Sequence, residues 1–221
     1  MILATDVSLE VRGVPEFTTI DTARAVVVPT GVDPVNASAC GDAAIALAMI
    51  DNVVIGDRVL IIGGGNSPCG AAATQLARLA GASHVAITTG PLIHAIKLAT
   101  KVDKVIAEGE DWMEDPNYME NKFDKIIDCS FREVNDPSKT SKVLKSNSNG
   151  GKLIHLRSFI QSTRNRKNDG LSRVLHLLKD KKLNITLDPS SPLSFSEEGV
   201  EMAYELHTNG NCRGRIVIQV K

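Results

Sequence analysis

The sequence predicts an α/β fold in which short buried strands alternate with helices around a parallel, doubly wound sheet. Three observations support this prediction. Short apolar runs rich in β-branched residues recur along the middle of the chain, segments of helical period separate them, and a glycine-rich turn follows the first run. Regular alternation of strand and helix is typical of βαβ units, whose right-handed crossovers produce a parallel sheet.

Length and composition favour one domain of ordinary size with extensions. The chain has 221 residues, of which 43% are hydrophobic, and this is enough to fill a core. The 25 basic and 26 acidic residues leave a formal net charge of -1, which provides no general attraction to nucleic acid or to an anionic membrane. Four widely spaced cysteines favour free thiols, and the first residues lack the apolar run of a signal peptide. We therefore expect a cytoplasmic protein that does not bind membranes.

Five segments have the pattern of strands buried on both faces. They are residues 58–62, 84–88, 104–108, 125–129 and 152–156. A sixth strand, at an edge of the sheet, is predicted over residues 183–189. Two further strand-like pieces, residues 24–29 and 214–220, lie outside this alternation, and we expect them to come together in a small β remnant formed by the chain ends.

Two segments between the strands have helical spacing. In residues 70–81 and 91–101 the apolar side chains fall on one stripe: Ala73, Leu76, Ala77 and Ala80 in the first, Leu92, Ile93, Ile96 and Ala99 in the second. Near the end of the chain, Ser196 precedes two acidic residues and a further helical segment, which is the pattern of an N-capped helix.

The glycine turn after residues 58–62 has the strongest functional signal. In a dinucleotide site, one glycine makes a tight turn, a second lets the backbone approach the pyrophosphate, and a third lets helix and strand pack closely. Gly65 and Gly70 occupy the first and third of these positions, while Ser67 takes the middle one and can offer a hydroxyl to phosphate. Pro68 suits the first turn of a helix but removes one N–H donor. We predict a Rossmann-type nucleotide site over Gly65, Asn66, Ser67, Pro68, Cys69 and Gly70; the alternative is a parallel α/β domain whose first turn is merely tight.

The end of the second predicted strand bears on the choice of cofactor. NAD sites commonly place an acid there to bond the ribose hydroxyls, whereas this chain has Thr88, Thr89 and Gly90. Because no carboxylate would repel a 2′-phosphate, NADP(H) is favoured over NAD(H). Thr88 and Thr89 would lie near the adenosine ribose, with Lys97 or Lys101 as a phosphate partner. The alternative for the two threonines is a β-branched strand end.

The stretch "GDRVLIIGGGNSPCGAAATQLARLAGASHV" resembles the opening of the cofactor domain in the medium-chain dehydrogenase/reductase superfamily, most closely its zinc-independent branch of quinone and enoyl reductases. "KVIAEGEDWMED", "FDKIIDCS", "GGKLIHL" and the closing segment 192–220 resemble its later elements, in the same order. The resemblance covers residues 23–221 and implies a remnant of the catalytic domain over 1–41, a cofactor domain over 42–190, and a helix and strand over 191–221 that return to the remnant. Members usually carry a longer β-rich catalytic domain first. Lys101 and Arg157 also stand where the family often has glycine.

This resemblance implies an NAD(P)H-dependent reductase of quinones or activated alkenes that transfers hydride without zinc and is weakened by truncation. No metal site is expected, because the cysteines and histidines form no ligand cluster in the sequence. Candidate catalytic residues are Ser130, His155 and Ser158, at the ends of the fourth and fifth strands, where α/β sheets bind ligands. His155 could donate a proton, or it could simply pack beside its neighbours. The resemblance also implies a small-molecule substrate. A homodimer is expected, because in relatives the sixth strand pairs with its copy in a second subunit.

Two other functions remain open. One is a paralogue that binds nucleotide, or only a partner protein, without turnover. The other is an RNA-binding derivative that uses the basic residues between Arg157 and Lys182, although Phe159 is the only aromatic residue among them and a solvated face is the simpler role.

Overall fold

The computed structural model describes residues 2–4, 25–65, 67–88, 90, 102–107, 110–130, 137–163, 169–210 and 212–220. The chain forms two compact units, one of residues 45–163 and one that combines 1–44 with 164–221. In this division residues 164–190 group with the chain ends, whereas the sequence analysis placed them with the cofactor domain; the domain boundaries at 42 and 190 remain a prediction.

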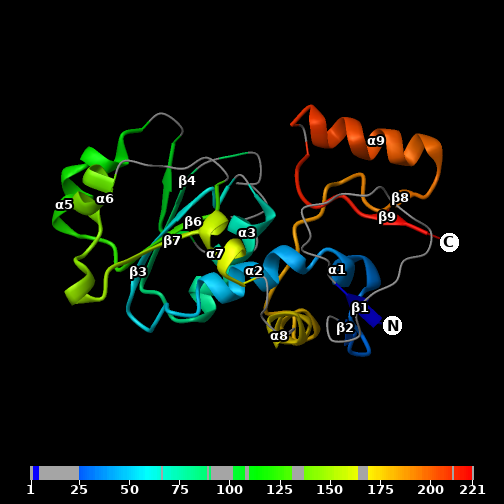
Figure 1. Cartoon of the computed structure of the whole chain (residues 1–221), viewed down its shortest axis with the longest axis horizontal. Coiled ribbons are helices and arrows are strands. Elements are labelled where there is room, and N and C mark those ends of the chain that lie inside the picture. The colour runs from blue at the N-terminus through cyan, green and yellow to red at the C-terminus, as the bar shows by residue number, and fades with distance from the viewer. Residues whose placement is uncertain are drawn as a thin grey trace. The chain divides into compact units, whose positions relative to one another are not determined.

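The larger unit contains a five-stranded parallel sheet (Figure 1). Its strands are β3 (Arg58–Ile62), β4 (His84–Thr88), β5 (Lys104–Ile106), β6 (Lys125–Asp128) and β7 (Lys152–His155), in the spatial order β5-β4-β3-β6-β7. The predicted doubly wound Rossmann-type sheet is therefore confirmed. All five strands begin where the sequence placed them, because each starts with a charged or polar residue ahead of a β-branched apolar run.

Both faces of this sheet are covered, which explains why its strands are almost uniformly apolar. On one face, Leu60, Ile62 and Ile126 pack against four larger side chains. Trp112 comes from η2 (Trp112–Glu114), Tyr118 from α5 (Pro116–Glu120), Phe123 from the segment just before β6, and Val143 from α6 (Pro137–Val143). Helix α3 (Pro68–Leu79) packs against β3 and β4. Its Ala73, Leu76 and Ala77 are fully buried, as the apolar stripe predicts.

The remaining elements of this unit are short. η3 (Asn147–Asn149) precedes β7, and α7 (Leu156–Thr163) begins directly after β7. The chain enters this unit through α2 (Gly41–Met49). The preceding helix, α1 (Pro34–Ser38), belongs to the other unit. The helix predicted over residues 91–101 lies outside the described residues.

The second unit contains two small sheets. β1 (Ile2–Ala4) pairs antiparallel with β2 (Ala25–Val27), and α8 (Asp169–Lys179) contacts β2. β8 (Leu193–Ser194) pairs in parallel with β9 (Ile218–Gln219). α9 (Glu197–Thr208) contacts both β8 and β9; Ser196 caps it by accepting a hydrogen bond from Gly199 N at 3.2 Å, as predicted. Thus the chain ends do form a small β part, but the two predicted pieces do not pair with each other, because each has its own partner strand.

The predicted sixth strand is wrong. Residues 183–189 do not extend the parallel sheet, and within them only Leu187 pairs, in an isolated bridge with Arg215. The reason is the buried carboxylate of Asp188, which accepts hydrogen bonds from Ser190 N at 3.0 Å and Arg213 N at 2.7 Å. These bonds close a turn and attach the segment to the chain's last residues. The predicted homodimer depends on pairing at this sheet edge, which residues 183–189 do not form. The homodimer itself remains a prediction.

At the amino edge of the sheet, Asp124 connects three segments. Its carboxylate accepts hydrogen bonds from Arg58 N at 2.9 Å and from Lys145 Nζ at 2.6 Å. Burial alone would raise the pKa of Asp124, but the bond from the Arg58 N–H and the Lys145 ammonium outweigh it and hold the pKa below its ordinary value. The folded pKa lies below the unfolded one, so this contribution to stability is present above the unfolded pKa and is lost as the pH falls through the folded pKa.

We therefore expect Asp124→Asn to lower the free energy of unfolding by about 1–3 kcal/mol near neutral pH, because the amide keeps the shape but weakens both bonds. The difference from the wild type should shrink once the pH falls below the ordinary aspartate pKa. Urea unfolding across this pH range measures both effects. The control is Glu114→Gln, which removes an exposed ion pair to Lys142 and should change stability little. Equal effects of the two substitutions at neutral pH would contradict the assignment.

Candidate active site

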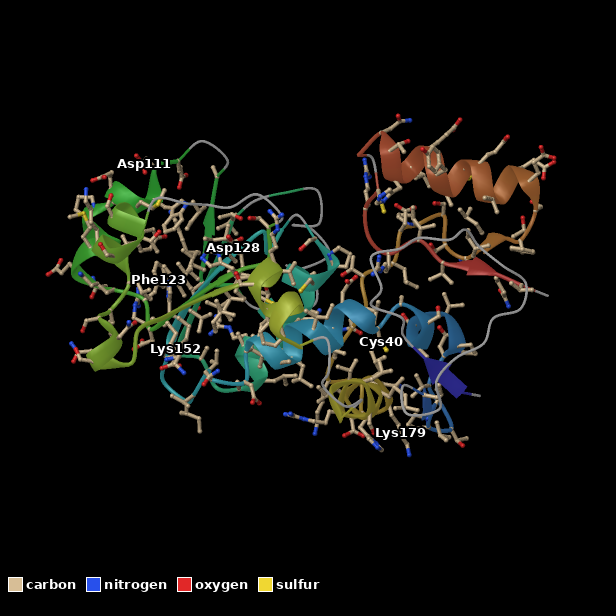
Figure 2. All side chains as sticks on the ribbon, in the orientation of Figure 1. Cys40, Asp111, Phe123, Asp128, Lys152 and Lys179 are labelled. Carbon is tan, nitrogen blue, oxygen red and sulfur yellow. The ribbon has the colours of Figure 1, made fainter. Side chains whose placement is uncertain are left out.

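The candidate site lies at the carboxyl edge of the sheet, where the strand order reverses. β3 leads through α3 to β4 on one side, whereas the chain crosses after β5 to β6 on the other side. In doubly wound sheets, ligands bind at such a switch point, between the turns that follow the two diverging strands. These turns are in contact here: a Cβ built on Gly63 would lie 3.1 Å from Ser130 N. In Figure 2, Asp128 lies at the end of the strands opposite Lys152, which begins β7.

The turn after β3 depends on two glycines. Gly63 has a positive φ of 76°, so the tight turn is made there and not at Gly65, where the sequence pattern placed it. Gly70 lies in the first turn of α3, and a Cβ built on it would lie 2.8 Å from Gly64 Cα and closer still to the carbonyl oxygen of Gly63. The helix therefore approaches the turn to a distance that only glycine permits, which is the role expected of the third glycine of a dinucleotide site.

Thr88 holds this turn against β4. Its hydroxyl accepts a hydrogen bond from Gly63 N at 2.8 Å, and its carbonyl accepts one from Gly65 N at 3.0 Å. Ser67 N donates to Gly63 O at 3.2 Å. Thr88 thus has a structural role beside its proposed contact with ribose, and these three backbone N–H groups bond within the protein. Asn66, Thr89, Lys97 and Lys101 of the predicted site lie outside the described residues.

Ser67 is the N-cap of α3. Its Oγ accepts a hydrogen bond from Gly70 N at 3.0 Å, which satisfies one of the donors at the start of the helix. Among the described residues, its own hydroxyl proton has only distant acceptors, Gly63 O at 3.4 Å and Cys129 O at 3.5 Å. A phosphate oxygen near the turn could therefore take this proton without breaking a short bond. Pro68 occupies the first helical position, as expected.

Cys69 is part of the predicted nucleotide site, but its side chain points into the protein interior. Its side chain is buried, and its Sγ lies 4.0 Å from the Sγ of Cys129, also buried, at the end of β6. The two thiols pack the first turn of α3 against the neighbouring strand end. Only the backbone of Cys69 is placed to approach a ligand at the turn.

The structure brings His155 and Ser130 together through a residue that the sequence analysis missed, Asp128. This carboxylate is buried at the end of β6, and its Oδ1 accepts hydrogen bonds from Ser130 N at 2.8 Å and Ser130 Oγ at 2.6 Å. Its Oδ2 lies 3.2 Å from His155 Nδ1. Asp128 is paired in register with His155 of β7, so the two side chains project from the same face of the sheet. The sequence feature that could have indicated Asp128 is an acidic residue directly after the apolar pair Ile126 and Ile127, at the predicted strand end.

Ser158, the third catalytic candidate, does not join this group. It lies in α7 with an exposed side chain, and the structure records no hydrogen bond between it and the described residues of the group. Among the described residues, no three His, Cys, Asp or Glu side chains gather where they could hold a metal ion. No helix in the described part of the chain is long and apolar enough to cross a membrane.

Comparison with solved structures shows which proteins share this fold. The quinone oxidoreductase from Coxiella burnetii superimposes with a TM-score of 0.66 at 22% identity, over 90% of this chain and 65% of its own. AibC superimposes with a TM-score of 0.68 at 19% identity, over 90% of this chain and 64% of its own. A putative zinc-binding dehydrogenase from Sinorhizobium meliloti, bound to NADP, matches with a TM-score of 0.57 at 21% identity, over 73% of this chain and 53% of its own.

These likenesses establish a shared fold with oxidoreductases. The chain spans 64% of the length of AibC, 65% of the length of the quinone oxidoreductase and 53% of the length of the dehydrogenase. No family model matches the sequence, and no curated protein matches it.

The close approach at Gly70 predicts a large cost for a single methyl group. Gly70→Ala should lower the free energy of unfolding by about 1–3 kcal/mol, because the new Cβ overlaps backbone atoms of the turn. Gly170→Ala is the matched control: Gly170 also lies in the first turn of a helix, α8, and a Cβ there would come no closer than 3.4 Å to Ala44 O. Thermal unfolding of both variants decides the matter. A Gly70→Ala protein as stable as the wild type would show that the turn is looser than described.

Proposed function

We propose that this protein is a zinc-independent, NADP(H)-dependent oxidoreductase of the medium-chain dehydrogenase/reductase type, acting on quinones or activated alkenes. The observation that carries the proposal is the arrangement at the switch point. A glycine turn with the close helix approach of a dinucleotide site lies beside the buried Asp128 and the half-exposed His155. The shared fold with a quinone oxidoreductase and with an NADP-bound dehydrogenase supports the same reading.

The residues present fit a dinucleotide at this turn. Gly70 has no side chain where the first turn of α3 meets the backbone of Gly63 and Gly64, and the Ser67 hydroxyl can turn its proton to a phosphate oxygen. Thr88, at the end of β4, would lie near the adenosine ribose. When bound, the cofactor supplies or accepts a hydride, while the protein orients the substrate and handles the accompanying proton.

The preference for NADP(H) rests on the end of β4. The strand ends at Thr88, and residues 88–90 contain no carboxylate that would bond the ribose hydroxyls or repel a 2′-phosphate. A dehydrogenase that shares the fold is bound to NADP. Another is described as an NAD-dependent alcohol dehydrogenase, so the fold alone does not determine the preference.

A second candidate function is nucleotide binding without turnover. The observation that favours it is the internal use of the turn's N–H groups: those of Gly63, Gly65 and Ser67 already bond to Thr88 and Gly63. Fewer donors then remain for a pyrophosphate than in a turn whose amides point outward. Because the chain spans less than two thirds of the structures it matches, binding and turnover are separate questions.

We expect NADPH to bind at least roughly ten-fold more tightly than NADH, a difference of about 1.4 kcal/mol, because no acid follows β4. Calorimetric titration of the purified protein with each cofactor measures this. Equal affinities would contradict the NADP(H) preference, and absence of binding by both would overturn the proposed function. Steady oxidation of NADPH in the presence of a quinone or an enone separates the reductase from the non-catalytic binder.

A further inference from the structure

We infer that Asp128 is a positioning residue that holds His155 with its hydrogen on Nδ1, so that Nε2 is the atom that exchanges a proton with the substrate. The inference rests on the proposed reductase function and assigns the second half of the reaction, proton transfer, to a named atom.

The hydrogen bonds around Asp128 fix which atom of His155 carries the hydrogen. Oδ1 accepts from both the N–H and the hydroxyl of Ser130, at 2.8 and 2.6 Å, which leaves Oδ2 for His155 Nδ1 at 3.2 Å. An ionised carboxylate accepts hydrogen bonds and donates none, so Nδ1 must be the protonated nitrogen of the neutral ring. Nε2 then holds a lone pair in the neutral ring and an N–H in the imidazolium.

In this pair, the Asp128 carboxylate is held firmly, whereas the His155 ring is partly accessible to solvent. Asp128 is 1% exposed and belongs to a strand hydrogen-bonded to both of its neighbours, so its carboxylate has little freedom. The His155 side chain keeps 29% of its surface exposed. Among the described residues, the structure records no hydrogen-bond partner for Nε2. The nitrogen that Asp128 does not hold is therefore the one that a ligand at the carboxyl edge can reach.

This arrangement matches what reduction of a quinone or an enone requires. Hydride addition to the electron-poor carbon brings two electrons and one hydrogen, and it leaves negative charge on the substrate oxygen. The Nε2–H bond of the imidazolium breaks, its electron pair stays on Nε2, and a new O–H bond forms on the substrate. The neutral ring then regains a proton from water. The Asp128 carboxylate keeps its hydrogen bond to Nδ1 during the transfer, and a positioned general acid of this kind contributes about 10²–10⁴-fold to rate.

Nitrogen NMR of protein labelled with ¹⁵N-histidine tests the tautomer directly, and loss of a signal in His155→Gln assigns it. We expect neutral His155 in the wild type to carry its hydrogen on Nδ1. In Asp128→Asn, the two donors of Ser130 keep the amide oxygen, so the NH₂ group faces His155 Nδ1 and the hydrogen moves to Nε2. Glu114→Gln, the same change at an exposed site, should leave the His155 signals unchanged. A wild-type ring with its hydrogen on Nε2 overturns the inference, and this measurement needs no variant to fold.

Kinetics supply the second test. Asp128→Asn and His155→Gln should lower kcat for a quinone or enone by roughly 10²-fold or more, with the NADPH dissociation constant nearly unchanged. Full activity of His155→Gln overturns the inference while leaving the proposed function intact. Absence of NADPH binding by the wild type overturns the proposed function and with it the catalytic role of Nε2, whereas the NMR result still decides whether Asp128 fixes the ring.

Discussion

The contact between the first turn of α3 and the turn after β3 is the constraint on which the rest of the larger unit depends. With no side chain on Gly70, the helix backbone lies directly against Gly63 and Gly64. This brings the buried face of α3 onto β3 and β4, and it lets the Cys69 and Cys129 thiols meet at the start of the helix. The same approach places the N-terminus of α3 beside the end of β6. Sheet packing and the candidate site therefore share one steric requirement.

The two edges of the sheet use aspartates for different purposes. At the amino edge, Asp124 and Asp103 accept hydrogen bonds from the backbone N–H groups of Arg58 and Val85, near the starts of β3 and β4. Asp103 also pairs with Arg78, and although its partial burial opposes ionisation, these bonds hold its pKa below the ordinary value. Nearby, burial lowers the pKa of His84, and the Arg58 charge adds to this effect. The hydrogen bonds of Asp124 and Asp103 thus join neighbouring segments at the starts of the strands.

At the carboxyl edge, Asp128 instead bonds to Nδ1 of His155, whose side chain is partly exposed.

The candidate site shows how a motif can keep its backbone geometry while its donors change partners. Ser67 replaces the middle glycine and acts as helix cap, and Thr88 binds two amides of the turn. Ser67 and Thr88 both stabilise the turn by internal hydrogen bonds, and a hydrogen bond of this kind typically contributes about 1 kcal/mol. They also make the turn less dependent on a bound anion. A protein with these features can retain the fold of a cofactor domain whether or not it turns over substrate.

The sequence by itself determined the local features of this protein: five strands, the stripe of α3, the cap at Ser196, and glycine at position 70. These depend on neighbouring residues, on side-chain periodicity and on sterics within one turn, so they can be read from the chain in order. Only the tertiary structure decided which strand ends meet. The pairing of Asp128 with His155 depends on the register between β6 and β7, and the diversion of residues 183–189 from the sheet depends on Asp188 reaching Arg213. Such contacts join residues far apart in the chain, and their free energy depends on distances that no local pattern encodes.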